Sequence, residues 1–218
     1  MRPPPHVYVP GPWEGDTLGL GHQTRHHLEG VLRRSSGETV SYTDGAGSIG
    51  VGLFAGGAIE RGTEQQRTTR SGIHVVVAPP RKTERVRILV EKLVELGVES
   101  IQWLDAIRRQ TKDPRPEKCF TWAVSAVEQS GGAWLPELGG ARSWNSLSDA
   151  GVWVADGNAP GTLPHSMKRP VTVVIGPEGG FAPDEVPASL DRFSMAGTVL
   201  RIETAAVSAV TLVIDRLR

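Results

Sequence analysis

The sequence predicts an α/β protein with a carboxyl-terminal parallel sheet and a small β-rich domain near the amino terminus. Three observations support this prediction. Residues 73–104 show a strand, an amphipathic helix and a second strand, the pattern of a parallel βαβ unit. Two apolar runs, Val152–Ala155 and Val171–Ile175, are typical of strands buried on both faces of a sheet. The first 70 residues show short strands and turns with little helix.

Length and composition are those of an ordinary globular protein. The 218 residues suffice for one large domain or two small ones, and the formal net charge is zero. A single cysteine, Cys119, excludes an internal disulfide framework and leaves no zinc-ligand cluster. The chain shows no signal-peptide pattern and no apolar run near the roughly 20 residues that span a bilayer. We therefore expect a cytoplasmic protein without a metal site or a membrane partner.

Basic residues concentrate in the middle of the chain. Residues 61–118 hold 13 Lys and Arg against 8 Asp and Glu. This belt could hold the phosphates of a nucleic acid, or it could be solvated helix faces and a charged loop. Charge alone favours the second interpretation.

Residues 1–71 are expected to form the amino-terminal domain. Glu38–Thr43 and Ile49–Phe54 are predicted strands, and the turn residues between them predict a hairpin. A short helical stretch is expected from His26 to Arg33. Gly56–Ser71 is polar and is expected to be a loop that leads to the domain boundary.

Residues 72–218 are expected to form the second domain, which begins with strand Ile73–Ala78. A helix should follow from Thr83, as N-cap, to Leu96, and a strand from Val98 to Leu104. The apolar spacing predicts that the helix buries Val86, Leu89, Val90, Leu93 and Val94. Residues 105–117 should form a loop before a helix over Lys118–Ser130.

A glycine-rich turn, Gly176–Gly180, directly follows the strand Val171–Ile175. In open α/β sheets, ligands bind at this carboxyl end of the strands. The glycines allow positive φ and a close approach of backbone to a ligand, although a plain strand-to-helix turn would also need them. The turn is not a P-loop, because no Lys-Ser/Thr follows the last glycine.

A second segment, Gly197–Ala205, leads from a glycine through an expected strand end into an expected helix start. The last helix, Glu203–Leu217, should carry its apolar stripe on Val207, Val210, Thr211 and Ile214.

Together, GPEGGF at 176–181 and LRIETA at 200–205 resemble the SPOUT superfamily of knotted methyltransferases, and within it the RsmE family. EKLVELGVESI at 91–101 resembles a further family segment, and residues 26–47 resemble its small PUA-like RNA-binding β-barrel. Glu128-Gln129-Ser130 also matches. However, Gly131 and Gly132 stand where the family usually has an arginine.

The resemblance implies a SPOUT fold with a deep trefoil knot, through which the last helix is threaded. It also implies a homodimer that uses S-adenosylmethionine (SAM) to methylate N3 of a uridine in 16S rRNA of the 30S subunit (the m3U1498 modification), as part of rRNA processing and ribosome biogenesis.

The resemblance also assigns site residues. The implied cofactor-binding residues are Val154, Ala155, Ile175, Gly176, Glu178, Gly179, Gly180, Gly197, Leu200, Ile202 and Ala205. The catalytic candidates are Arg201 and Glu203; Arg201 would stabilise the anion of the base, or instead form a structural ion pair with Glu178 or Glu203. The RNA-contact candidates are Arg25, His27, Arg33, Arg34, Lys82 and Arg109.

Two alternatives stay open. The arginine missing after Ser130 fits an RNA-binding or ribosome-assembly protein that keeps the knot but has lost catalysis. The second alternative is a knotted methyltransferase that acts on another RNA. No nucleophile elbow, metal triad or carboxylate pair predicts a hydrolase.

Overall fold

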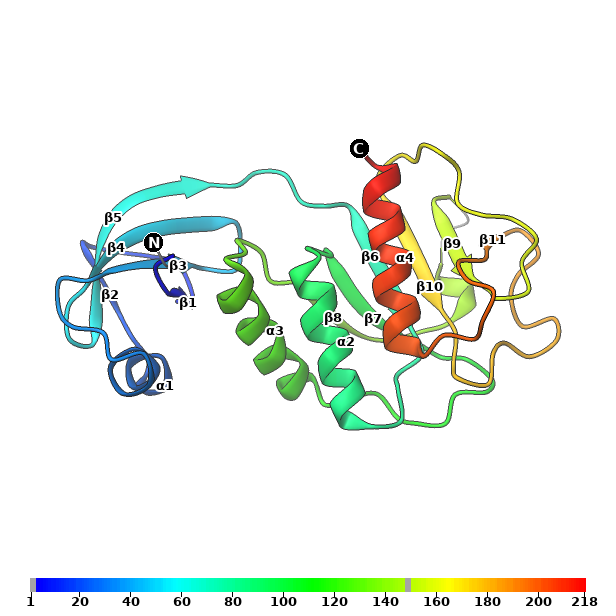
Figure 1. Cartoon of the computed structure of the whole chain (residues 1–218), viewed down its shortest axis with the longest axis horizontal. Coiled ribbons are helices and arrows are strands. Elements are labelled where there is room, and N and C mark those ends of the chain that lie inside the picture. The colour runs from blue at the N-terminus through cyan, green and yellow to red at the C-terminus, as the bar shows by residue number, and fades with distance from the viewer. Residues whose placement is uncertain (1–2, 148–149) are drawn as a thin grey trace. The chain divides into compact units, whose positions relative to one another are not determined.

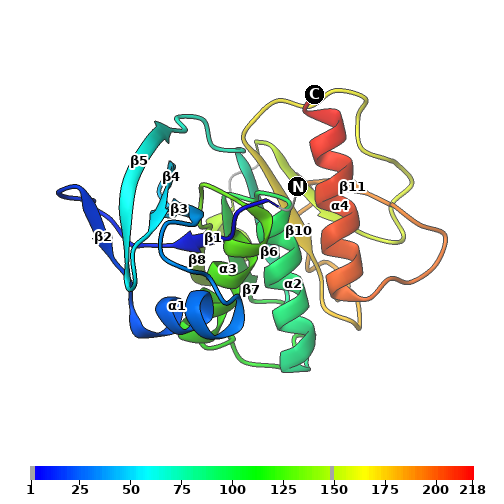
Figure 2. The ribbon, with the colours of Figure 1, turned by 60° about the vertical axis from the view of Figure 1, so that its left-hand side comes forward.

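The computed structural model describes residues 3–147 and 150–218 and divides into two compact units. The first comprises Met1–Arg70 and Val124–Leu135, and the second comprises Ser71–Ala123 and Pro136–Arg218. Residues 124–135, which fall within the expected second domain of residues 72–218, group with the first unit. Figure 1 gives the elements and Figure 2 turns them by 60°.

The first unit contains a curled five-stranded sheet in the order β1-β3-β4-β5-β2 (Figure 2). Its strands are β1 His6–Tyr8, β2 Thr17–Gly19, β3 Thr39–Thr43, β4 Ser48–Phe54 and β5 Ala58–Gln66. β1 pairs with β3 in parallel, and the other pairs are antiparallel. The predicted hairpin is therefore present as β3 and β4.

Two expectations for this unit were wrong. Gly56–Ser71 is not a loop throughout, because β5 pairs with both β4 and β2. The sequence of β5 lacks the apolar alternation that predicts a strand, because Ile59 is its one buried residue. The helical stretch starts earlier than expected, as α1 His22–His26 followed by a π-helical turn, His27–Val31, in which Leu28 alone is buried.

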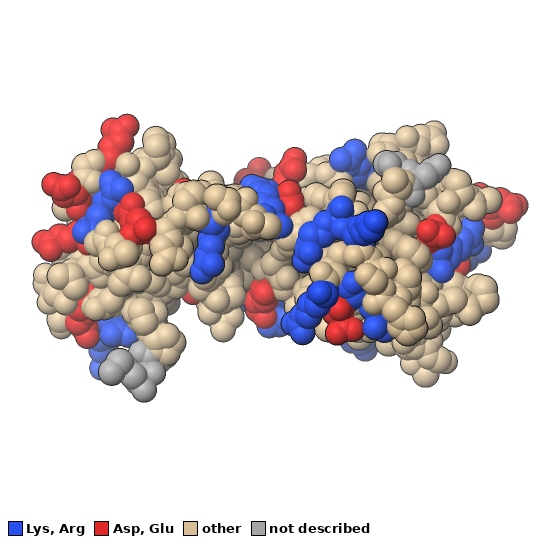
Figure 3. Space-filling model, turned by 90° about the horizontal axis from the view of Figure 1, so that it is seen from above, with Lys and Arg blue, Asp and Glu red and all other residues tan. Residues whose placement is uncertain are grey.

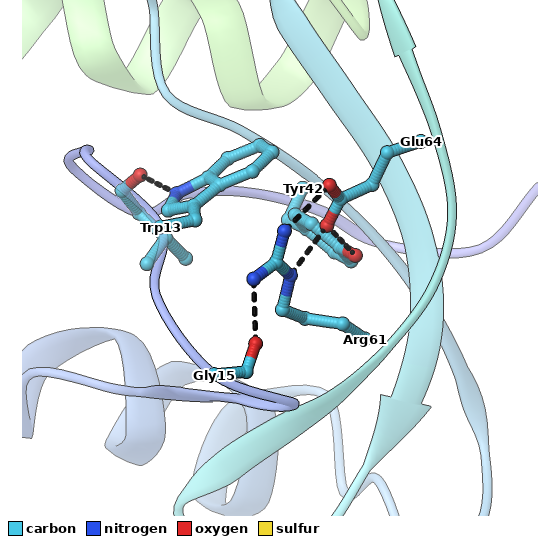
Figure 4. A network of polar contacts seen from close by, with 6 residues as sticks. Trp13, Gly15, Tyr42, Arg61 and Glu64 are labelled. Atoms are coloured by element: carbon cyan, nitrogen blue, oxygen red, sulfur yellow. Dashed lines mark hydrogen bonds and ion pairs between the residues drawn. The ribbon is translucent and has the colours of Figure 1, made fainter.

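A polar network lies beside the apolar core of the first unit (Figure 4). Arg61 donates from Nε and Nη2 to the two carboxylate oxygens of Glu64, each at 2.8 Å, and from Nη1 to the carbonyl of Gly15. The Tyr42 hydroxyl donates to Glu64 Oε1 at 2.8 Å. The Arg61 guanidinium lowers the pKa of Glu64, while burial and the bond to Glu64 raise the pKa of Tyr42 to about 12.

We expect Glu64→Gln to lower the free energy of unfolding by no more than about 1 kcal/mol at pH 7, because it removes a bidentate ion pair that solvent partly screens. A carboxyl group whose pKa is lower in the folded protein than in the unfolded chain stabilises the fold at pH values above its unfolded pKa, near 4.3. This stabilisation is lost as the pH falls through the pKa of the folded state. The difference from wild type should therefore shrink below about pH 4. Urea unfolding at pH 7 and pH 3 measures this, with the exposed Glu60→Gln on the same strand as control. A difference independent of pH would contradict the account.

The second unit is built on a six-stranded, all-parallel sheet in the order β11-β9-β10-β6-β7-β8. Its strands are β6 Ile73–Val77, β7 Ser100–Leu104, β8 Glu137–Arg142, β9 Val152–Ala155, β10 Val171–Ile175 and β11 Asp191–Phe193. The bounds of β9 and β10 are those predicted, whereas β8 and β11 were not expected. Within the described residues, no helix has the length and apolar character needed to span a membrane.

Helices α2 Thr83–Glu95 and α4 Ile202–Arg216 pack against each other over the sheet (Figure 1). α2 buries the five apolar residues predicted for it, although its N-cap is Lys82 and not Thr83. The expected stripe of α4 was wrong apart from Val210. The helix buries Ile202, Ala206, Ala209, Val210 and Val213. Helix α3 spans Pro116–Ser130, two residues longer than predicted.

Candidate functional site

Parallel pairing brings several strand ends to one edge of the sheet in the second unit. Ile175, the last residue of β10, is in register with Ala155 of β9 and with Val77 of β6. Ala155 is in turn in register with Phe193 of β11. The segments that follow β9, β10 and β11 therefore start side by side, at the edge where open α/β sheets bind ligands.

A cavity of about 880 Å³ opens at this edge, within the range of ligand pockets. Ten of the eleven sequence-predicted cofactor residues line it: Ala155, Ile175, Gly176, Glu178, Gly179, Gly180, Gly197, Leu200, Ile202 and Ala205. Val154 does not, because it lies with no exposed surface in an apolar cluster that also contains Val76 of β6 and Val174 of β10. The structure thus gathers residues from three separate segments into one site.

Further lining residues were not among the predicted cofactor residues. They come from the turn after β9, from β11, from Pro177 and residues 181–184, from the residues on both sides of Gly197, and from the loop after β7, which contributes Arg108. The expected strand end before Leu200 was wrong, since residues 194–201 form no helix or strand. Thr198-Val199-Leu200 has strand-like composition, but no neighbouring strand pairs with it, and Val199 is 95% exposed.

The glycine turn needs its glycines for two different reasons. Gly180 alone of the three has positive φ, at 66°, and its N–H donates to Pro177 O at 2.9 Å. At Gly176 a Cβ atom would lie 2.7 Å from the ring of Phe181. Gly179 has neither constraint, so the positive φ that the glycines allow is used only at Gly180.

Arg85 of α2 joins two of the three segments. Its Nη1 lies 2.6 Å from Glu178 Oε1 in the glycine turn, and its Nε lies 3.6 Å from Glu203 Oε1 in the first turn of α4. The Glu203 side chain is 12% exposed, and its Oε2 is buried without a hydrogen-bond partner. The ion pairs that the sequence analysis considered for Arg201 are thus made by Arg85 instead.

Arg201 is the N-cap residue of α4, and its carbonyl accepts from Ala205 N at 2.8 Å. Its side chain is exposed and, among the described residues, has no polar partner and does not line the cavity. The two catalytic candidates therefore differ in setting: Arg201 is free at the surface, whereas Glu203 is held by Arg85.

The RNA-contact candidates also differ in setting. Arg25 is hydrogen-bonded to Glu29, Arg34 pairs with Glu38 at 3.4 Å, and Arg109 bonds to Asp113 and the Thr111 carbonyl. The remaining three are exposed: His27, Arg33 and Lys82. On the face shown in Figure 3, basic side chains alternate with acidic ones, and several gather on the part formed by the second unit.

Comparison with known proteins identifies the class. The family model of the RNA methyltransferase domain matches residues 67–214. The chain therefore belongs to the RNA methyltransferase domain family, which confirms the family resemblance found in the sequence.

Solved structures show the same fold over nearly the whole chain. Ribosomal RNA small subunit methyltransferase E from Neisseria gonorrhoeae, bound to SAM, has a TM-score of 0.82 at 23% identity over 96% of each chain. A methyltransferase from Legionella pneumophila in complex with SAM has a TM-score of 0.80 at 22% identity over 97% of each chain. A probable rRNA methyltransferase from Porphyromonas gingivalis has a TM-score of 0.83 at 24% identity, over 97% of this chain and 98% of that one.

We expect Arg85→Met to lower the free energy of unfolding by about 2 kcal/mol, because it leaves the largely buried Glu203 carboxylate without its cation. The matched control is Arg87→Met on the same helix, which breaks only a solvent-exposed pair with Glu91 and should lower the free energy of unfolding much less than Arg85→Met does. Urea unfolding of both variants measures the difference. Equal stability of the two would show that the Arg85 bridge contributes nothing.

Proposed function

We propose that the protein is a SAM-dependent methyltransferase that modifies N3 of a uridine in 16S rRNA. The observation that carries the proposal is the cavity in which ten predicted cofactor residues meet. Its lining combines the backbone of the glycine turn with the apolar side chains of Ile175, Phe193 and Leu200. Such a lining suits a cofactor that has a flat ring and polar edges. When bound there, SAM supplies a methyl group activated on a sulfonium.

The work of the chain's own residues is binding and alignment. The glycine turn and residues 195–200 would hold the cofactor, while Arg85 keeps the turn and the start of α4 in fixed positions. Arg201, which is exposed beside the cavity-lining Leu200, would supply a positive charge to the substrate. Glu203, which is paired with Arg85, would hold the start of α4 in place.

The substrate edge constrains how RNA is bound. N3 lies on the Watson–Crick edge of uracil, so the target uridine must be unpaired or extruded before it reacts. We propose that the first unit is a PUA-like barrel that binds flanking RNA through exposed residues such as Arg33. We also propose a cytoplasmic homodimer acting on the 30S subunit, with α4 threaded in a trefoil knot. The family resemblance supports each of these proposals.

Purified protein should transfer one methyl group from SAM to 16S rRNA or to 30S subunits from a strain that lacks this gene. Mass spectrometry of nuclease fragments should place the group on N3 of one uridine. SAM and RNA binding without transfer would favour the non-catalytic alternative, for which Gly131-Gly132 is the sequence argument. Methylation of a different RNA would keep the enzyme class and contradict the substrate.

RNA binding should depend on Arg33, which is exposed and has no polar partner among the described residues. We expect Arg33→Gln to weaken binding to 16S rRNA and to reduce the slope of log affinity against log salt by about one, because one phosphate contact is lost. Filter binding between 50 and 200 mM salt measures the slope. Arg87→Gln removes an equal charge from α2 and should leave it unchanged. An unchanged slope in Arg33→Gln would remove this residue from the RNA surface.

A further inference from the structure

Arg108 lies in the wall of the cavity, although the sequence analysis gave it no role. It belongs to the loop between β7 and α3 and is the residue of that loop that lines the cavity. Its Nη1 donates to the carbonyl of Gly179 at 3.0 Å. The guanidinium is thus attached to the glycine turn that the proposed function assigns to the cofactor.

The loop that carries Arg108 is fastened on both sides. The N–H of Ile107 donates at 2.7 Å to Glu185 Oε1, a carboxylate that is only 8% exposed. On the other side, the hydroxyl of Thr111 donates to the carbonyl of Pro79 at 3.0 Å. Arg108 is therefore presented from a fixed backbone, as a preorganised donor must be.

Arg108 is available to bind a charged group of a ligand, because no carboxylate in the part of the chain that the structure describes pairs with it. The lining contains two cations, Arg108 and Arg192. Arg192 pairs with Asp156 at 3.5 Å and donates to the carbonyl of Val186 at 2.9 Å. Within residues 3–147 and 150–218, Arg108 has no carboxylate partner. A guanidinium carries five N–H donors, and the bond to Gly179 uses one.

We propose that Arg108 is a catalytic residue that binds the anionic oxygen of the substrate uracil. The inference rests on the proposed function. In the reaction, N3 releases its proton to solvent, and its electron pair forms the bond to the methyl carbon while the carbon–sulfur bond breaks. Sulfur keeps the bonding pair and becomes a neutral thioether. Before the transfer, negative charge is shared between N3 and the two carbonyl oxygens, O2 and O4, and the guanidinium stabilises it there.

A base oxygen fits this position better than a phosphate. The base must enter the cavity to react, whereas the phosphates of an extruded nucleotide remain with the backbone outside. Arg108 lines the cavity and is attached to the glycine turn, whereas Arg201 does not line it. Arg108 and Arg201 thus contact different parts of the substrate, and Arg108 is the one nearer the reacting ring.

The test is single-turnover methylation of 30S subunits at saturating SAM and RNA. Arg108→Ala should slow methyl transfer on the order of a hundredfold, as loss of a transition-state donor does, with SAM affinity by calorimetry and melting temperature unchanged. The loss should diminish as the pH is raised, because N3 then ionises without help. Arg108→Lys should recover part of the rate. Lys112→Ala, an exposed charge on the same loop outside the cavity lining, should keep the wild-type rate.

Each other outcome overturns the assignment. A normal rate at saturation with weaker RNA affinity and a smaller salt slope would place Arg108 on a phosphate. A parallel fall of SAM affinity and melting temperature would make it structural. A normal rate and affinity would leave it without a role. If the wild type itself does not methylate N3, the proposed function is wrong and the inference is wrong with it. If the wild type methylates N3 and Arg108→Ala is equally active, only the inference is wrong.

Discussion

The site depends on the parallel pairing of its strands. Because β6, β9, β10 and β11 run in the same direction and are in register, Val77, Ala155, Ile175 and Phe193 end at one edge. Antiparallel pairing of β9 with β10 would send the turn after Ala155 to the opposite edge, away from the glycine turn. Backbone hydrogen bonding in the sheet therefore decides which distant parts of the chain form the cavity, and the side chains only refine it.

Polar contacts then hold the irregular segments at this edge. Arg85 joins the glycine turn to the start of α4, and the buried Glu185 accepts from the loop that carries Arg108. Loops beyond strand ends have few apolar contacts of their own, so such bonds determine how rigid the site is. A methyltransferase needs this rigidity, because its rate comes largely from alignment of the acceptor with the methyl group.

Much of this arrangement was predictable from local sequence, and the exceptions have physical causes. β9, β10 and the buried stripe of α2 follow from continuous apolar runs and a 3.6-residue period. β5 was missed because Arg61 and Glu64 point into a polar network, which leaves Ile59 alone as an apolar marker. The buried side of α4 was misplaced because Ala206 and Ala209, which are small, occupy it. The partners of Arg85 and the position of Arg108 could not be predicted, since both depend on contacts between segments far apart in sequence.

A crystal structure of the protein grown with SAM tests the cofactor site most directly. We expect cofactor density in the cavity lined by Gly176, Gly179 and Leu200, with the methyl group facing the side from which Arg108 enters. Density elsewhere would contradict this expectation, for example in the separate cavity of about 810 Å³ beside His74 and Thr172. So would a cavity that stays empty at saturating SAM while the protein remains folded.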